Sequence, residues 1–170
     1  MTARITVLGI GNIILRDEGF GVRVMEELRD KSDFGDDVQF LDGGTLGMEL
    51  LVFLMETECL LVFDAVDGEE TDDELYVFRD DEVEAHFQEK LAVHELGIQD
   101  VLALLKLTGK APKRVTVIGA APKDLSVGTE LSAELKALVP KAAKLGGAEV
   151  EKWLGTLEPP EIAWADEDDE

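Results

Sequence analysis

A glycine-rich turn with two adjacent carboxylates is the part of this chain whose residue types and spacing point to chemistry. The segment Gly9 to Gly21 reads G-I-G-N-I-I-L-R-D-E-G-F-G, and its acids are Asp17 and Glu18. It follows a β-branched run and precedes an amphipathic segment, which predicts a strand-to-helix turn whose backbone N–H groups face a ligand. Such turns usually hold phosphate. Here the two carboxylates would repel a phosphate, because two like charges about 4 Å apart cost roughly 4 kcal/mol at an effective dielectric constant of about 20.

A dinucleotide site is the nearest conventional interpretation of this turn. Gly9 and Gly11 supply the first two glycines of a G-x-G-x-x-G motif. Asp42, at the end of the second predicted strand, has the position of a ribose-binding acid. Ile14 replaces the third glycine, so the motif is incomplete as well as acidic. A cation is therefore the ligand that the turn favours.

Two carboxylates and a histidine are the candidate ligands for such a cation. Glu18 follows the first predicted strand and Asp64 lies near the end of the third, so both are expected at the carboxyl edge of a parallel sheet. A helix N-terminus stabilises an ionised carboxylate by about 0.3–1 kcal/mol. Borderline metals also favour imidazole, and of the two histidines His94 lies in a predicted loop near this edge. A histidine in such a loop is more often a structural or surface residue than a ligand, so both interpretations of His94 stay open here. His86 lies among acids in a predicted surface helix. The spacing alone predicts an α/β domain with a candidate cation site.

The alternation of strand-like and helix-like segments predicts a doubly wound α/β sandwich around these residues. The segment 75–78 follows a loop too short for a helical crossover, which predicts an antiparallel strand at an edge. The predicted strands are 4–10, 38–41, 59–66, 75–78 and 114–118. The predicted helices are 20–30, 46–55, 80–90, 98–107 and 130–145, the last kinked or interrupted at Pro140.

Length and charge limit the class of protein. The 170 residues predict one domain over residues 1–157 and a disordered acidic tail over residues 158–170. A formal net charge of −22 argues against nucleic acid as a partner. No apolar run approaches the roughly 20 residues of a membrane span, so no membrane partner is expected. The single cysteine, Cys59, lies in an apolar run and is expected to be a buried, reduced thiol, which fits the cytoplasm.

Four motifs in order resemble those of the hydrogenase maturation proteases, which process the large subunit of nickel–iron hydrogenases. They read G-I-G-N-I-I-L-R-D-E-G-F-G-V, L-D-G-G-T-L-G, V-F-D-A-V-D and H-E-L-G-I-Q-D-V-L. The resemblance extends from about Arg4 to Leu154. It implies a three-layer α/β/α sandwich of the phosphorylase/hydrolase-like type, with a mixed five-stranded sheet and one antiparallel strand. Ala121, where the family often has Gln, and the acidic tail depart from the family pattern.

The resemblance also implies a set of site residues and a reaction. Motif by motif, the metal-contacting and catalytic residues fall on Glu18, Asp64 and His94, and recognition around the cleavage site falls on Asp42 with Gly43, Gly44 and Thr45. The implied substrate is the hydrogenase large-subunit precursor, which loses a C-terminal extension after nickel insertion. The nickel belongs to the substrate, cadmium or a similar ion is expected to substitute in vitro, and no nucleotide is needed. Without a Ser or Cys nucleophile motif, direct attack by water is favoured.

Two other classes of protein remain open at this point. The same turn could serve a non-catalytic module that binds a metal or a nucleotide. Alternatively, the chain could be an acidic scaffold that acts through its tail, in which case removal of residues 165–170 would abolish function. We expect little effect from that removal.

Overall fold

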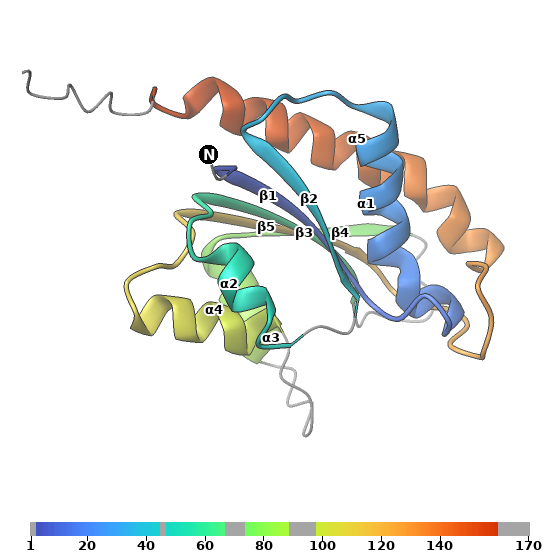
Figure 1. The fold of residues 1–170 in the computed structure, drawn as a ribbon. Helices are drawn as coiled ribbons and strands as arrows, with labels where there is room; N and C mark the ends of the chain where they lie inside the picture. Colours follow the sequence, from blue (N-terminus) through green and yellow to red (C-terminus); the bar gives the residue numbers. More distant parts are fainter. Residues whose placement is uncertain (1–2, 45–46, 67–73, 89–97, 160–170) are drawn as a thin grey trace, which may run out of the picture.

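The structure is a computed structural model that describes residues 3–44, 47–66, 74–88 and 98–159. Within these residues five strands form a mixed sheet in the order β2-β1-β3-β5-β4 (Figure 1). The strands are β1 (Ile5–Ile10), β2 (Val38–Gly44), β3 (Cys59–Ala65), β4 (Leu75–Arg79) and β5 (Arg114–Ala120). The helices are η1 (Arg16–Gly19, a 3₁₀ turn), α1 (Phe20–Lys31), α2 (Leu50–Leu54), α3 (Asp81–Gln88), α4 (Ile98–Leu107) and α5 (Ala133–Thr156).

Helices cover both faces of the sheet, which makes the fold a three-layer α/β/α sandwich (Figure 1). Alternate residues of a strand face opposite sides. In β3, Leu61 and Phe63 pack in the core beneath α1 and α5, whereas Leu60 and Val62 pack in the core beneath α2, α3 and α4. This explains why β3 is apolar at nearly every position. The fold class that the resemblance implies is confirmed.

The antiparallel strand lies at an edge, as the short preceding loop predicts. Among the described residues, β4 pairs only with β5, and the pair is antiparallel, with Leu75 opposite Ala120 and Arg79 opposite Thr116. β2, β1, β3 and β5 are parallel to one another. Their carboxyl ends therefore meet at one edge of the sheet, where the candidate residues were expected.

The last helix is the largest departure from the sequence prediction. It begins at Ala133 and continues to Thr156, whereas the prediction ended it at residue 145. Pro140 lies inside it and does not end it. Gly146 is a close-packing residue and not a helix stop, because a Cβ there would lie 2.4 Å from Phe63 Cζ. The apolar face continues to Trp153, so the packing against the sheet outweighs the two glycines at 146 and 147.

Smaller differences lie at the element ends. α2 spans Leu50–Leu54 and is shorter than the predicted 46–55, while β2 extends into Gly43 and Gly44. No described helix is long and apolar enough to cross a membrane. Residues 160–170, which include most of the predicted acidic tail, lie outside the described part of the chain.

Candidate functional site

The turn after β1 is held by close contacts between backbone atoms. Gly11 has φ +131°, and a Cβ on it would lie 1.7 Å from the carbonyl oxygen of Glu18. Asn12 closes the turn through its side chain, which accepts from Ile14 N at 3.1 Å. Glu18 N donates to Leu15 O at 3.1 Å. The glycine therefore serves the approach of Glu18 to β1, and the protein's own carbonyl occupies the space where a phosphate cradle would need room.

The same packing brings Glu18 to the end of β3. The first turn of α1 lies directly on β3, since a Cβ on Gly21 would lie 2.0 Å from the carbonyl oxygen of Phe63. Phe63 precedes Asp64, and Glu18 is three residues before Gly21. Both acidic residues are partly exposed. We call this place, made by η1 and the ends of β1 and β3, the carboxyl corner; Glu18 and Asp64 both lie there.

Asp42 flanks the corner from the other side of β1. Its backbone pairs with Gly9, which on its opposite side pairs with Phe63. The register between β1 and β2 shifts after Gly9, and Gly11 N donates to Gly44 O at 3.0 Å. Asp42 is exposed, and Gly44 has φ +44°. The D-G-G segment is thus part of the same edge.

Some predicted site residues lie outside the described part of the chain. These are His94 and Thr45. In the part that the structure describes, no group of three His, Cys, Asp or Glu side chains is arranged to hold a metal ion. The described corner therefore offers two carboxylates, and the imidazole remains a sequence prediction.

Asp17 has a role that its neighbourhood in sequence does not reveal. It was expected, with Glu18, to put charge on the ligand side of the turn, but its side chain is fully buried. Oδ2 accepts from Lys123 N (2.8 Å), Asp124 N (2.9 Å) and Ser132 Oγ (2.8 Å), and Oδ1 accepts from Ser132 N (2.7 Å). Asp17 therefore ties η1 to the loop between β5 and α5 and is not available as a ligand.

Cys59 is buried, as predicted. Burial in the apolar strand raises the pKa of its thiol, and the neighbouring Glu58 adds to that effect. A thiol with a raised pKa is a poor nucleophile, because the thiolate is the reactive form. The residue is part of the core and not of the candidate site.

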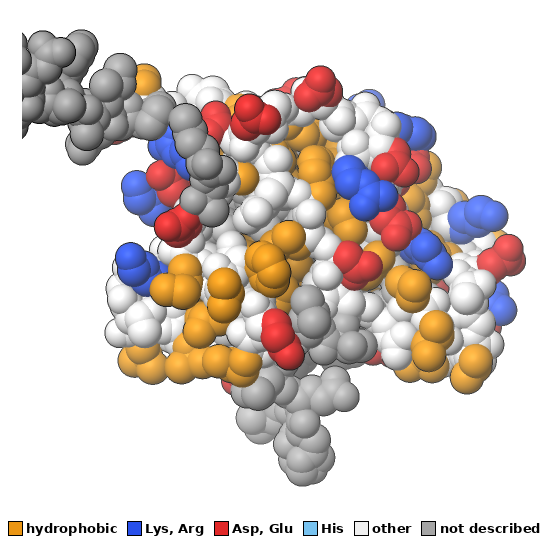
Figure 2. All heavy atoms as spheres, viewed as in Figure 1, with side chains coloured by type: hydrophobic (Ala, Val, Ile, Leu, Met, Phe, Trp, Pro, Cys, Tyr) orange, Lys and Arg blue, Asp and Glu red, His pale blue; other side chains and the backbone are white. Residues whose placement is uncertain are grey.

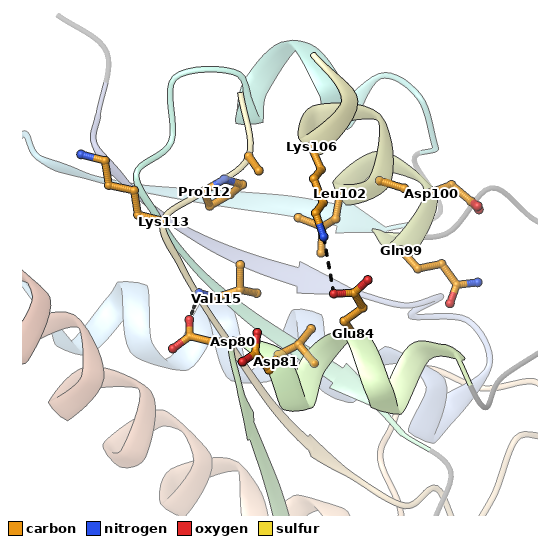
Figure 3. Close-up of a pocket in the computed structure, with 13 residues that line it drawn as sticks. Asp80, Asp81, Glu84, Gln99, Asp100, Leu102, Lys106, Pro112, Lys113 and Val115 are labelled. Carbon is orange, nitrogen blue, oxygen red and sulfur yellow. Dashed lines mark hydrogen bonds and ion pairs between the residues drawn. The ribbon is translucent and has the colours of Figure 1, made fainter. Parts of the chain in front are cut away.

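A cavity of about 500 Å³ lies away from the carboxyl corner, between α3, α4 and the start of β5 (Figure 3). Glu84 of α3 and Lys106 of α4 face each other across it at 3.7 Å (Figure 3). Both side chains are largely exposed, so their ion pair adds little stability. The chemistry favours the carboxyl corner instead, because its acids lie at the ends of parallel strands, where the ligands of such sheets bind. We take the corner as the candidate site.

Comparison with known sequences identifies the family of the chain. Residues 22–149 match the family model described as hydrogenase maturation protease. The chain is 41% identical over 140 residues to the hydrogenase 2 maturation protease of Escherichia coli, a match that spans 82% of this chain and 85% of that protein. It is 47% identical over 123 residues to the hydrogenase expression/formation protein HupD of Rhodobacter capsulatus, with 72% of this chain and 59% of that longer protein covered.

Solved structures share the fold. The hydrogenase maturating endopeptidase HybD of Escherichia coli superposes with a TM-score of 0.82 at 38% identity, over 88% of this chain and 93% of that one. A hydrogenase maturation protease of Thermococcus kodakarensis superposes with a TM-score of 0.67 at 28% identity, over 88% and 98%. Sequence and fold agree, and the chain belongs to the hydrogenase maturation protease family, a family of peptidases.

Proposed function

We propose that this protein is an endopeptidase that removes the C-terminal extension from the large-subunit precursor of a nickel–iron hydrogenase. The cut follows nickel insertion, and the nickel enters the site as part of the substrate. Glu18, Asp64 and His94 bind that nickel. Asp42, Gly43, Gly44 and Thr45 contact the polypeptide around the scissile bond. The reaction takes place in the cytoplasm and uses no nucleotide.

The observation that carries this proposal is the position of Glu18 and Asp64 at one corner of the sheet, in a chain that belongs to a peptidase family. Carboxylates alone suit many cations, and an imidazole added to them suits borderline metals such as nickel. Three protein ligands leave coordination positions open for groups of the substrate. A precursor without nickel would lack the ion that joins the two chains, so only the loaded precursor would dock.

Docking through the metal places the adjoining peptide bond at the carboxyl corner. The scissile bond is thereby held in a fixed orientation for hydrolysis. Water attacks the scissile carbonyl carbon, the C–N bond breaks, and the amine leaves with a proton. The buried thiol of Cys59 is unsuited to attack, in keeping with water as the nucleophile. One carboxylate of the corner, or water polarised by the metal, assists this step.

The test mixes the purified chain with a nickel-loaded large-subunit precursor and follows the loss of the extension on a gel. Glu18→Gln, Asp64→Asn and His94→Ala are each expected to slow cleavage about 100-fold or more, by the usual scale of acid–base and metal-ligand losses. Glu134→Gln, an exposed acid in the first turn of α5, is the matched control and is expected to cleave at the parent rate.

Two results would contradict the proposal. One is parent-like cleavage by the three site variants, with folding checked by circular dichroism and thermal unfolding. The other is efficient cleavage of a precursor prepared without nickel, which would remove the role of the metal in docking.

A nucleotide-binding module would gain stability from its ligand, so the proposal also predicts that NAD or FMN leaves the unfolding temperature of this protein unchanged.

A further inference from the structure

Four apolar side chains are exposed beside the carboxyl corner. They belong to the turn after β1 and to the loop between β5 and α5, and hydrophobic side chains gather at this end of the molecule, at the lower right of Figure 2. We call them the apolar rim. They are Ile13 (38% exposed), Ile14 (55%), Leu125 (53%) and Val127 (83%).

Backbone hydrogen bonds hold the two segments of the apolar rim side by side. Gly128 N donates to Ile14 O at 2.9 Å, and Arg16 N donates to Gly128 O at 3.0 Å. These bonds form a short parallel bridge between Leu15 and Gly128. In a parallel bridge the residues preceding the pair lie next to each other on the same side. Ile14 and Val127 are therefore neighbours, and segments more than 100 residues apart build one surface.

The exposure of the apolar rim is not the result of a loose loop. Asp17 accepts four hydrogen bonds from residues 123–132, and its own N–H donates to Asp124 O at 3.0 Å. Arg16 adds an ion pair to Asp124 at 3.3 Å. The loop before α5 is thus fastened to the turn that carries Glu18. A fixed, exposed apolar surface next to a site is the usual property of a surface that binds another chain.

We propose that the apolar rim is the surface on which an apolar segment of the precursor docks while its nickel lies at the carboxyl corner. The inference rests on the proposed function and adds a binding surface to it. Glu18 follows Ile13 and Ile14 by only a few residues, so the rim borders the corner and is within reach of a polypeptide held there. A second copy of this chain is a poorer occupant, because a net charge of −22 on each copy opposes self-association.

The experiment compares Val127→Asp with Leu107→Asp. Both residues are 83% exposed. Leu107 is the last residue of α4 and precedes β5, so it lies toward the amino ends of the parallel strands, away from the carboxyl corner. Cleavage of nickel-loaded precursor gives KM and kcat, and immobilised precursor gives Kd for the same proteins. Val127→Asp is expected to raise KM and Kd about tenfold with kcat unchanged, the scale of one central interface contact. Leu107→Asp is expected to have the KM and Kd of the parent. Val127→Ile, which keeps an apolar side chain, is expected to have the KM of the parent.

The remaining outcomes separate the two proposals. A parent that binds the precursor without cutting it overturns the proposed function, while the Kd comparison still decides on the apolar rim. Parent-like KM and Kd for Val127→Asp overturn the rim, as does an equal loss in Leu107→Asp, which would indicate a general effect of charge. A dimer that Val127→Asp dissociates without a change in KM would assign the surface to self-association and also overturn the proposal.

Discussion

Asp17 and Glu149 are two buried carboxylates that lie near opposite edges of the sheet and accept hydrogen bonds from different kinds of donor. Asp17 takes three of its four bonds from backbone N–H groups of the loop before α5 and of the α5 N-cap, Ser132. Glu149, in α5, accepts from the side chains of Arg79 (3.2 and 3.3 Å) and Thr116 (2.9 Å). Thr116 lies in the first half of β5, away from the carboxyl corner.

The kind of donor determines what each of these buried carboxylates stabilises. A carboxylate that binds backbone donors fixes the path of the chain, and Asp17 fixes it next to Glu18 and the apolar rim. A carboxylate that binds side chains fixes packing, and Glu149 fastens α5 to β4 and β5. We therefore expect Asp17 to matter for activity as well as stability, and Glu149 for stability alone.

The largest effect is expected at Gly11, which allows the tight turn on the Asp17 side of this comparison. Gly11→Ala combines a positive φ with a Cβ placed 1.7 Å from the Glu18 carbonyl oxygen. Backbone strain and overpacking together are expected to lower the free energy of unfolding by about 4 kcal/mol. Urea unfolding measures it. Gly109→Ala, with φ +73° and open space, is the control and should lose about 1–2 kcal/mol. Equal losses would show that the contact with Glu18 is unimportant.

Asp17→Asn tests the comparison directly. An amide NH₂ must face at least one N–H donor in place of an oxygen, whichever way it is oriented, so about 2–3 kcal/mol of unfolding free energy should be lost. Among molecules that remain folded, kcat/KM for the precursor should also fall. Asp33→Asn is the control, since this exposed acid accepts one bond, from Gly35 N at 3.3 Å, and should change stability by less than about 0.5 kcal/mol. An unchanged kcat/KM in Asp17→Asn would reduce Asp17 to the same role as Glu149.

Glu149→Gln should have the smaller effect, about 1–2 kcal/mol of unfolding free energy, because Arg79 is half-exposed and can be solvated. Cleavage of the precursor should proceed with the parent kcat/KM. A loss of activity in a folded Glu149→Gln protein would break the comparison, since it would show that the edge far from the corner also controls the reaction.

The pH dependence of Glu149 gives the smallest and sharpest signal. Burial raises the pKa of this carboxyl, but hydrogen bonds from Arg79 and Thr116 outweigh burial and hold it below its ordinary value of 4.5. The folded state therefore binds fewer protons than the unfolded state in this range, and the stabilisation is lost as the pH falls below 4.5. The difference in unfolding free energy between parent and Glu149→Gln should narrow there. If the difference in unfolding free energy between parent and Glu149→Gln stays constant down to about pH 3, the ionised form of Glu149 is not the source of the stabilisation.

Much of the fold follows from patterns that are local in the sequence. The apolar run of β3 predicts a central strand, and the short loop before β4 predicts an antiparallel edge. The end of α5 could not be predicted in this way, because two glycines usually weaken a helix. Gly146 stays helical since it packs on Phe63, a contact between residues far apart in the chain.

The candidate site, like the fold, was determined in part by the sequence and in part by the tertiary structure. By itself the sequence determined that acids follow the strands at one edge, because parallel strands align their carboxyl ends, and so Glu18, Asp64 and Asp42 could be named. It did not determine which of the adjacent acids Asp17 and Glu18 would be buried, since both have the same charge and chemistry. The tertiary structure decided that, because the donors that bury Asp17 lie 106–115 residues away in the loop before α5.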